Sequence, residues 1–377
     1  MESCNRSGRN PFFSSAQTST NRHGVLHLPG FDRAPFIARK GTDNKVVYIG
    51  VAFALFFLAT YRSLGVGTDS EAYYTIYYQY ANNDAYVAAS DNYKTAEFIW
   101  LAMLRYFRNA DNYRGLLVML AALNAIPLFY ALKKQSKWPL FSVFLYIALY
   151  FYGNSLNTMR QYAAMSFLLL AIPFLKKGKN KYYLLLMLLA TAIHMSALFV
   201  FILVWSIYKA NLNFDNKLRY SLIIAVSFII GMFFTAKFKE ALEPIANLFA
   251  SSNYEYYLSG DTVNESRNLL SNLGFNLIAI FMLYINKDAN NIYFKLYILG
   301  VIMVNLLAGL GAFSGRVASY FSLMQIVAIP NLLYLIKKSF QKYLYIVIFI
   351  VYGLSIYIYY LSKNLSEIVP YSNIFFN

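Results

Sequence analysis

The chain has 377 residues, of which 59% are hydrophobic, 19% aromatic and only 13% charged. A soluble domain has about 25% charged residues, so this composition excludes an ordinary cytosolic enzyme. The formal net charge of +16 raises the alternative of nucleic-acid binding or of contact with anionic lipid.

The chain begins with a polar, basic stretch without hydrophobic periodicity, residues 1–45, which we expect to be a disordered cytoplasmic tail. Its single cysteine, Cys4, excludes internal disulfides and a cysteine-built metal site. Two of the three histidines, His23 and His27, also lie in this tail. Because a zinc site needs three or four clustered ligands, we expect neither a metal nor a cofactor.

Residues 46–377 form the predicted transmembrane domain, in which successive apolar runs are each about long enough to cross a bilayer core of roughly 30 Å. Backbone groups inside lipid must be hydrogen-bonded internally, which favours helices. We therefore expect an all-α, polytopic integral membrane protein with about 10–11 transmembrane helices. The runs lie near 46–61, 115–132, 139–152, 161–175, 182–208, 220–236, 269–286, 296–313, 317–336 and 343–361.

The run 182–208 is either one tilted helix or a hairpin of two short helices broken near His194. With a hairpin, the tail and one set of loops carry two thirds of the 33 Lys and Arg, whereas a single crossing divides these residues far more evenly. The positive-inside rule therefore favours the hairpin, a cytoplasmic N-terminus and eleven crossings. The same asymmetry explains the net charge by topology and argues against nucleic-acid binding. The predicted cytoplasmic loops are 133–137, 176–181, 209–219, 287–295 and 337–342.

Two predicted outer loops, 62–114 and 237–268, are candidates for function, because loops carry function more often than the helices they connect. The helix interiors hold almost no ionisable groups apart from His194. Coupled transporters usually place such groups at mid-membrane, so their scarcity argues against coupled transport.

Two arginines are expected at the outer N-termini of helices: Arg160 before the run 161–175 and Arg316 before the run 317–336. Free N–H groups and the positive end of the helix dipole, together with a guanidinium, make a site suited to phosphate. Two such sites facing one cavity would suit a diphosphate. The alternative is that each arginine extends to the lipid headgroups.

His194 is a candidate general base, since an imidazole titrates near neutrality and can take a proton from a hydroxyl. The alternative is a buried, hydrogen-bonded residue at a helix break. Asp69 and Glu97 are the acidic candidates, and Asp69 also fits a capping box over Thr68 to Glu71 that would stabilise a first helical turn.

The tyrosine-dense stretch that includes Tyr73 and Tyr77 has helical spacing. An interfacial aromatic belt is one interpretation, and stacking on sugar rings is the other.

These motifs in this order resemble the EpsG-like family of exopolysaccharide membrane proteins, which is grouped with the Wzy-type O-antigen and capsule polymerases of bacteria. The resemblance covers roughly residues 46–377. It is carried by Arg62, Gly67-Thr68-Asp69, Tyr73, Glu97, Asn157-Thr158-Met159-Arg160-Gln161, His194-Met195-Ser196-Ala197-Leu198, Arg316 and Val369-Pro370-Tyr371.

The resemblance implies a metal-independent, GT-C-like glycosyltransferase of the bacterial inner membrane, with its active site facing the periplasm. Such an enzyme would join repeat units carried on undecaprenyl diphosphate, in contact with the bilayer and with a chain-length regulator as a potential partner. It implies that Arg160 and Arg316 bind the diphosphate and that His194 activates the acceptor hydroxyl or orients the diphosphate, with Asp69 or Glu97 as the competing base. The further candidates for substrate binding are Asn157, Gln161, Tyr73 and Tyr77.

The alternatives are an O-antigen ligase, which would attach finished polymer to another acceptor, and a lipid-linked glycan flippase or transporter. A membrane acyltransferase is weaker, because it would be expected to carry more catalytic histidines than His194 alone.

Overall fold

The computed structural model describes residues 44–93, 97–233, 269–288, 290–307 and 311–375. The chain divides into two units, 1–33 and 34–377, and every described residue belongs to the second. The predicted tail up to residue 43 and the whole predicted loop 237–268 therefore lie outside the described residues.

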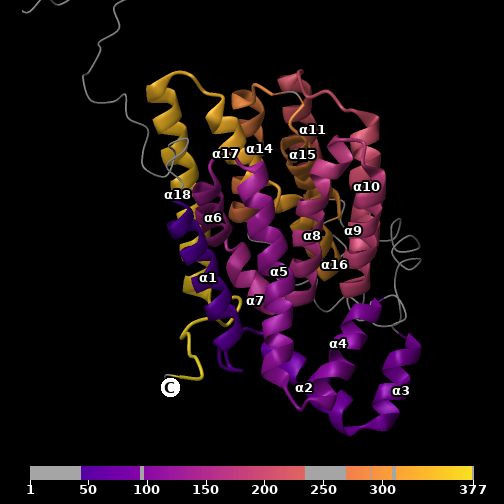
Figure 1. Ribbon diagram of the computed structural model, residues 1–377. Helices are drawn as coiled ribbons and strands as arrows, with labels where there is room; N and C mark the ends of the chain where they lie inside the picture. The colour runs from indigo at the N-terminus through magenta and orange to yellow at the C-terminus, as the bar shows by residue number, and fades with distance from the viewer. Residues whose placement is uncertain (1–43, 94–96, 234–268, 289, 308–310, 376–377) are drawn as a thin grey trace, which may run out of the picture. The chain divides into compact units, whose positions relative to one another are not determined.

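Every named element of the described chain is a helix (Figure 1). The helices are α1 Lys45–Tyr61, α2 Ser70–Asn82, α3 Asp84–Tyr93, α4 Phe98–Asn109, α5 Tyr113–Gln135, α6 Pro139–Ala148, α7 Phe151–Asn157, α8 Met159–Lys176, α9 Asn180–Ile193, α10 Ser196–Ala210, α11 Lys217–Phe233, α14 Leu269–Ile285, α15 Ile292–Leu306, α16 Gly311–Ser322, α17 Gln325–Tyr334 and α18 Ser339–Lys363.

The helix α8 is the centre of the bundle. Its small and aliphatic side chains are fully buried between α5, α9 and the later helices, as Ala163, Leu168 and Ile172 illustrate. By contrast, α18 leaves an apolar stripe exposed, including Val347, Val351 and Ile358. A continuous apolar face of this kind needs lipid rather than water beside it. The protein is therefore an all-α, polytopic membrane protein.

Three helical stretches in the described residues are long and apolar enough to cross a membrane: 113–135, 315–334 and 339–363. A fourth crossing results if α6 and α7 count as one span bent by 61°. The bend lies at Tyr150, whose φ of 65° is in the left-handed region. The shorter apolar helices, which include α1, α9, α10 and α15, have 10–17 residues, so the expected 10–11 crossings remain a prediction.

The apolar run 182–208 is a hairpin, as the charge pattern predicts. Helix α9 ends at Ile193 and α10 begins at Ser196. The Tyr183 hydroxyl donates a 2.7 Å hydrogen bond to the Phe201 carbonyl. These two residues lie on either side of the break, so the contact brings α10 back alongside α9.

The predicted cytoplasmic loops meet at one end of the bundle. Lys217 Nζ donates to the Tyr284 carbonyl at 2.8 Å, which joins the loop before α11 to the end of α14. Lys342 Nζ lies 6.0 Å from the Trp138 ring centroid, which joins the start of α18 to that of α6. We call this the lysine end.

At the other end, α2, α3 and α4 form a helical layer beside the C-terminal segment (Figure 1). Part of the predicted outer loop 62–114 is thus helical. Buried aromatic side chains, including Tyr80, Trp100 and Phe107, pack this layer against the start of α5.

Candidate active site

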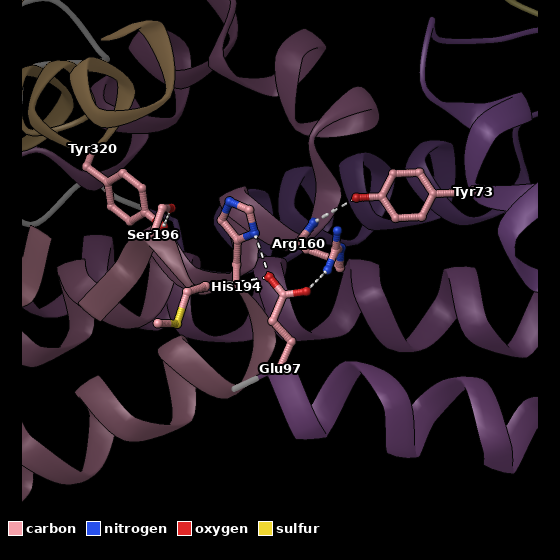
Figure 2. A network of polar contacts seen from close by, with 7 residues as sticks. Tyr73, Glu97, Arg160, His194, Ser196 and Tyr320 are labelled. Atoms are coloured by element: carbon pink, nitrogen blue, oxygen red, sulfur yellow. Dashed lines mark hydrogen bonds and ion pairs between the residues drawn. The ribbon is translucent and has the colours of Figure 1, made fainter. Parts of the chain in front are cut away.

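Glu97, directly before α4, is the centre of a network of polar contacts (Figure 2). Its Oε2 lies 2.5 Å from Arg160 Nη1. Its Oε1 accepts a hydrogen bond from the Met195 backbone N–H at 3.1 Å and lies 3.4 Å from His194 Nδ1. One carboxylate therefore joins the end layer, the start of α8 and the break between α9 and α10.

Arg160 is the second residue of α8, as the sequence predicts, so it lies at the positive end of the helix dipole. Its backbone N–H donates to the Tyr73 hydroxyl at 3.4 Å. Its guanidinium carbon lies 4.8 Å from the centroid of the Trp100 ring, a cation–π distance. The arginine is therefore fixed by a carboxylate and an indole, and it does not extend freely to lipid headgroups.

His194 stands at the break between the two short helices, in an extended conformation with φ −152° and ψ 115°. The residue is 5% exposed. One ring nitrogen faces Glu97 and the other is turned away from it (Figure 2). Among the described residues, neither ring nitrogen has a hydrogen-bond partner although both are buried, and Nδ1 has only its 3.4 Å contact with Glu97 Oε1. Buried polar atoms are usually paired, so Nε2, which is turned away from Glu97, is available to a substrate group.

The charges of the network act on one another. Burial alone would raise the pKa of Glu97, but Arg160, His194 and the Met195 N–H outweigh it and hold that pKa well below its usual range. Burial lowers the pKa of His194; Glu97 opposes this, while Arg160 and Arg316 lower it further. The result at neutral pH is an ionised Glu97 beside a neutral imidazole.

The second predicted arginine lies in the second turn of α16, and its expected position at a helix N-terminus is wrong. Helix α16 begins at Gly311, and Gly315 lies inside it. Gly315 therefore does not mark the helix boundary that the sequence analysis expects there. Arg316 is half-buried, and its carbonyl accepts a 2.8 Å hydrogen bond from Gln161 Nε2. Its charge acts on His194, so both predicted arginines belong to one electrostatic environment.

Asn157 supports the loop that contains Gly67. An added Cβ on Gly67 would meet the Asn157 side-chain oxygen, and the glycine φ of +102° is one that other residues rarely adopt. The Asn157 amide donates to the Ser366 carbonyl at 3.3 Å. The Gly67 N–H donates to the Glu367 carbonyl at 2.9 Å. Gly67 and Asn157 thus join the start of the domain to its C-terminal segment.

Asp69 occupies the N-cap position of α2, but its side chain makes no capping hydrogen bond. Thr68 donates a 3.4 Å hydrogen bond to it instead. Within the described residues, no hydrogen bond or ion pair joins Asp69 to Glu97, Arg160 or His194. Of the two predicted acids, the structure brings only Glu97 into the network.

The predicted tyrosines are buried on the inner face of α2 and do not form an exposed belt, whereas Tyr74 and Tyr78 are exposed. Tyr73 packs edge-on against Trp100 with ring centroids 5.8 Å apart. Tyr77 donates to the Phe107 carbonyl at 3.1 Å. Stacking of Tyr73 and Tyr77 on sugar rings remains a prediction.

Two side chains of this site escape sequence analysis: Trp100, beside Arg160, and Tyr320, whose hydroxyl lies 3.1 Å from that of Ser196. Met195 lies in the motif that begins at His194, but the motif does not predict the hydrogen bond from its N–H to Glu97. Backbone donors and single aromatic residues carry no motif. Arg62 carries a weak signal through its place in the family pattern. It is 2% exposed and donates to the carbonyls of Ala59 and Leu156 at 2.6 and 2.8 Å.

The arrangement can perform general-base chemistry. A carboxylate 3.4 Å from Nδ1 favours the tautomer in which Nδ1 carries the proton and Nε2 can accept one. The neighbouring guanidinium can stabilise negative charge on an oxygen. Within the described chain, no group of three or more His, Cys, Asp or Glu could hold a metal ion.

Comparison with curated proteins and with solved structures found no match. Comparison with protein families matched residues 45–373 to the EpsG family. The matched region contains the whole Glu97 network and both predicted arginines. Because the match spans most of the chain, this membrane protein belongs to the EpsG family.

Proposed function

We propose that the chain is a polysaccharide polymerase that joins oligosaccharide repeat units carried on undecaprenyl diphosphate at the periplasmic face of the bacterial inner membrane. Membership of the EpsG family supports a function of the exopolysaccharide-polymerase type. The observation that carries the chemistry is the Glu97 carboxylate, which faces His194 on one side and pairs with Arg160 on the other.

In the proposed reaction, His194 Nε2 takes the proton from the acceptor hydroxyl of one lipid-linked unit. The hydroxyl oxygen bonds to the anomeric carbon of the donor glycan, and the bond from that carbon to the diphosphate oxygen breaks. Arg160 and Arg316 bind the departing diphosphate, which carries away the negative charge. Glu97 orients the imidazole and stabilises the imidazolium that forms.

The bacterial inner membrane and the cytoplasmic N-terminus are part of the same proposal. The orientation is supported by the gathering of the basic loops at the lysine end, away from Glu97.

The test is deletion of the gene followed by a gel of the surface glycan. A surface core that bears a single repeat, with the polymer ladder lost, is the expected result. Loss of even the single repeat would indicate a ligase or a flippase and overturn the polymerase assignment. Complementation with Arg160→Ala and Arg316→Ala should leave the protein in the membrane without restoring the ladder.

A further inference from the structure

A cavity of about 790 Å³ opens at the lysine end. Four lysines line it: Lys134, Lys137, Lys176 and Lys177. Lys176 ends α8, the helix that carries Arg160 in its first turn, so at 1.5 Å per residue the cavity lies about 24 Å from the candidate active site. The cavity is therefore separate from the Glu97 network.

The lysines are exposed, and none of the four forms an ion pair with a carboxylate of the described chain. Lys134 and Lys137 lie against the rings of Tyr130 and Tyr334, with Nζ 5.8 and 5.5 Å from the centroids. Among the described residues that line the cavity, Asp288 is the one acidic side chain. The cavity therefore has a strong excess of positive charge, with ammonium groups available to an anion.

Hydrogen bonds between helices fix the floor of this cavity. Gln135 Nε2 donates to the Leu169 carbonyl at 2.8 Å, and the Tyr293 hydroxyl donates to Gln135 Oε1 at 2.6 Å. Asn331 donates to the Gln135 carbonyl at 3.1 Å and accepts from the Lys137 N–H at 2.8 Å. Helices α5, α8, α15 and α17 are thus joined beside the cavity, which is a built feature of the fold.

An apolar groove of about 560 Å³ adjoins the cavity. The two share Tyr130, Leu170 and Phe174 as lining residues, so they are continuous. The groove runs between α5, α8 and α9, and it is lined by aliphatic and aromatic side chains such as Ile126 and Leu186. The combined space has positive charge in the cavity and apolar side chains along the groove. It therefore matches a ligand with an anionic head and a hydrocarbon chain.

We propose that the cavity and groove together bind an anionic phospholipid of the bilayer. The phosphate would lie among the four lysines, and an acyl chain would occupy the groove. Basic pockets between transmembrane helices bind anionic headgroups in this way. Charge complementarity, together with the continuity of the two spaces, selects this occupant over a zwitterionic lipid or a soluble phosphate, neither of which uses both features.

The experiment is native mass spectrometry of the purified full chain, mixed with equal amounts of phosphatidylglycerol and phosphatidylcholine. Phosphatidylglycerol should be retained preferentially. A lysine near an anionic headgroup contributes on the order of a fivefold gain in affinity. Replacing all four cavity lysines by Gln should therefore weaken retention by at least about tenfold, allowing for screening.

The matched control replaces Lys179, Lys181, Lys337 and Lys338 by Gln, since these exposed lysines lie at the same end outside the cavity. This control should retain the lipid as the unmodified protein does. Ala122→Trp, which fills the groove without changing charge, should also reduce retention.

Equal retention of the two lipids by the unmodified protein would overturn the proposal. Equal losses in the cavity and control variants, or retention by the Ala122→Trp variant, would do the same. In a second mixture, in which a polyprenyl phosphate or glycerol phosphate competes with phosphatidylglycerol, preference for either competitor would also refute it. Should the fourfold variant fail to fold, the pair Lys176→Gln and Lys177→Gln, at the exposed end of α8, tests the same expectation.

Discussion

Replacing Glu97 by Gln tests the central contact of the candidate site. The amide keeps the size of the carboxylate and can still accept from the Met195 N–H, but it leaves the Arg160 charge without its partner. Breaking a buried ion pair by removing one member costs about 3–5 kcal/mol. The two side chains are 13% and 19% exposed, so we expect the lower end, about 3 kcal/mol.

The assay is a double-mutant cycle read by thermal unfolding in detergent. Glu97→Gln and Arg160→Gln should each lower the Tm, and their combination should cost little more than either alone, because the second change removes the unpaired charge left by the first. A double variant whose loss equals the sum of the two single losses would refute the coupling. All three variants should lose the polymer, because the proposed chemistry needs both side chains.

The remaining predictions concern the base, its titration and the glycine loop. His194→Asn keeps a donor towards Glu97 but no Nε2, so it should keep the Tm and lose activity by at least about 100-fold; activity within tenfold of the unmodified protein would remove His194 as the base. Because the pKa of His194 is lowered, its neutral form persists below the ordinary value of about 6.5. Transfer measured with lipid-linked units should therefore hold steady from pH 7.5 to 6.5 and fall only at lower pH, whereas a midpoint above 6.5 would contradict this. Gly67→Ala should destabilise the protein by about 1–3 kcal/mol, while Gly65→Ala, in open space at ordinary φ, should leave the Tm unchanged.

Much of the fold follows from periodicity and charge. The apolar runs become helices, and the basic loops meet at one end because the positive-inside rule acts on whole segments. The hairpin at His194 follows from counting Lys and Arg on the two sides of the membrane. The bend at Tyr150 does not follow, because a left-handed tyrosine leaves no mark in the residue pattern.

The candidate site is only partly predictable. Sequence indicates Arg160 and His194 by residue type and position. It cannot choose between Asp69 and Glu97, since both precede a helix and resemble caps. Only packing of the end layer decides that Glu97 reaches His194 and Arg160. The position of Arg316 is mispredicted because Gly315 resembles a helix boundary and instead lies within a helix.

The backbone contact between Ser63 and Ser372 joins residues more than 300 positions apart. The ribosome synthesises the Gly67 loop long before the C-terminal segment with which this loop pairs. Until residue 372 has been made, the backbone groups of this loop that later pair with the C-terminal segment have no protein partner there. In an incomplete chain that is already inserted in the membrane, Arg62 and Gly67 therefore lack their backbone contacts with the C-terminal segment. The fold thus delays assembly of this end of the molecule until the bundle is almost complete.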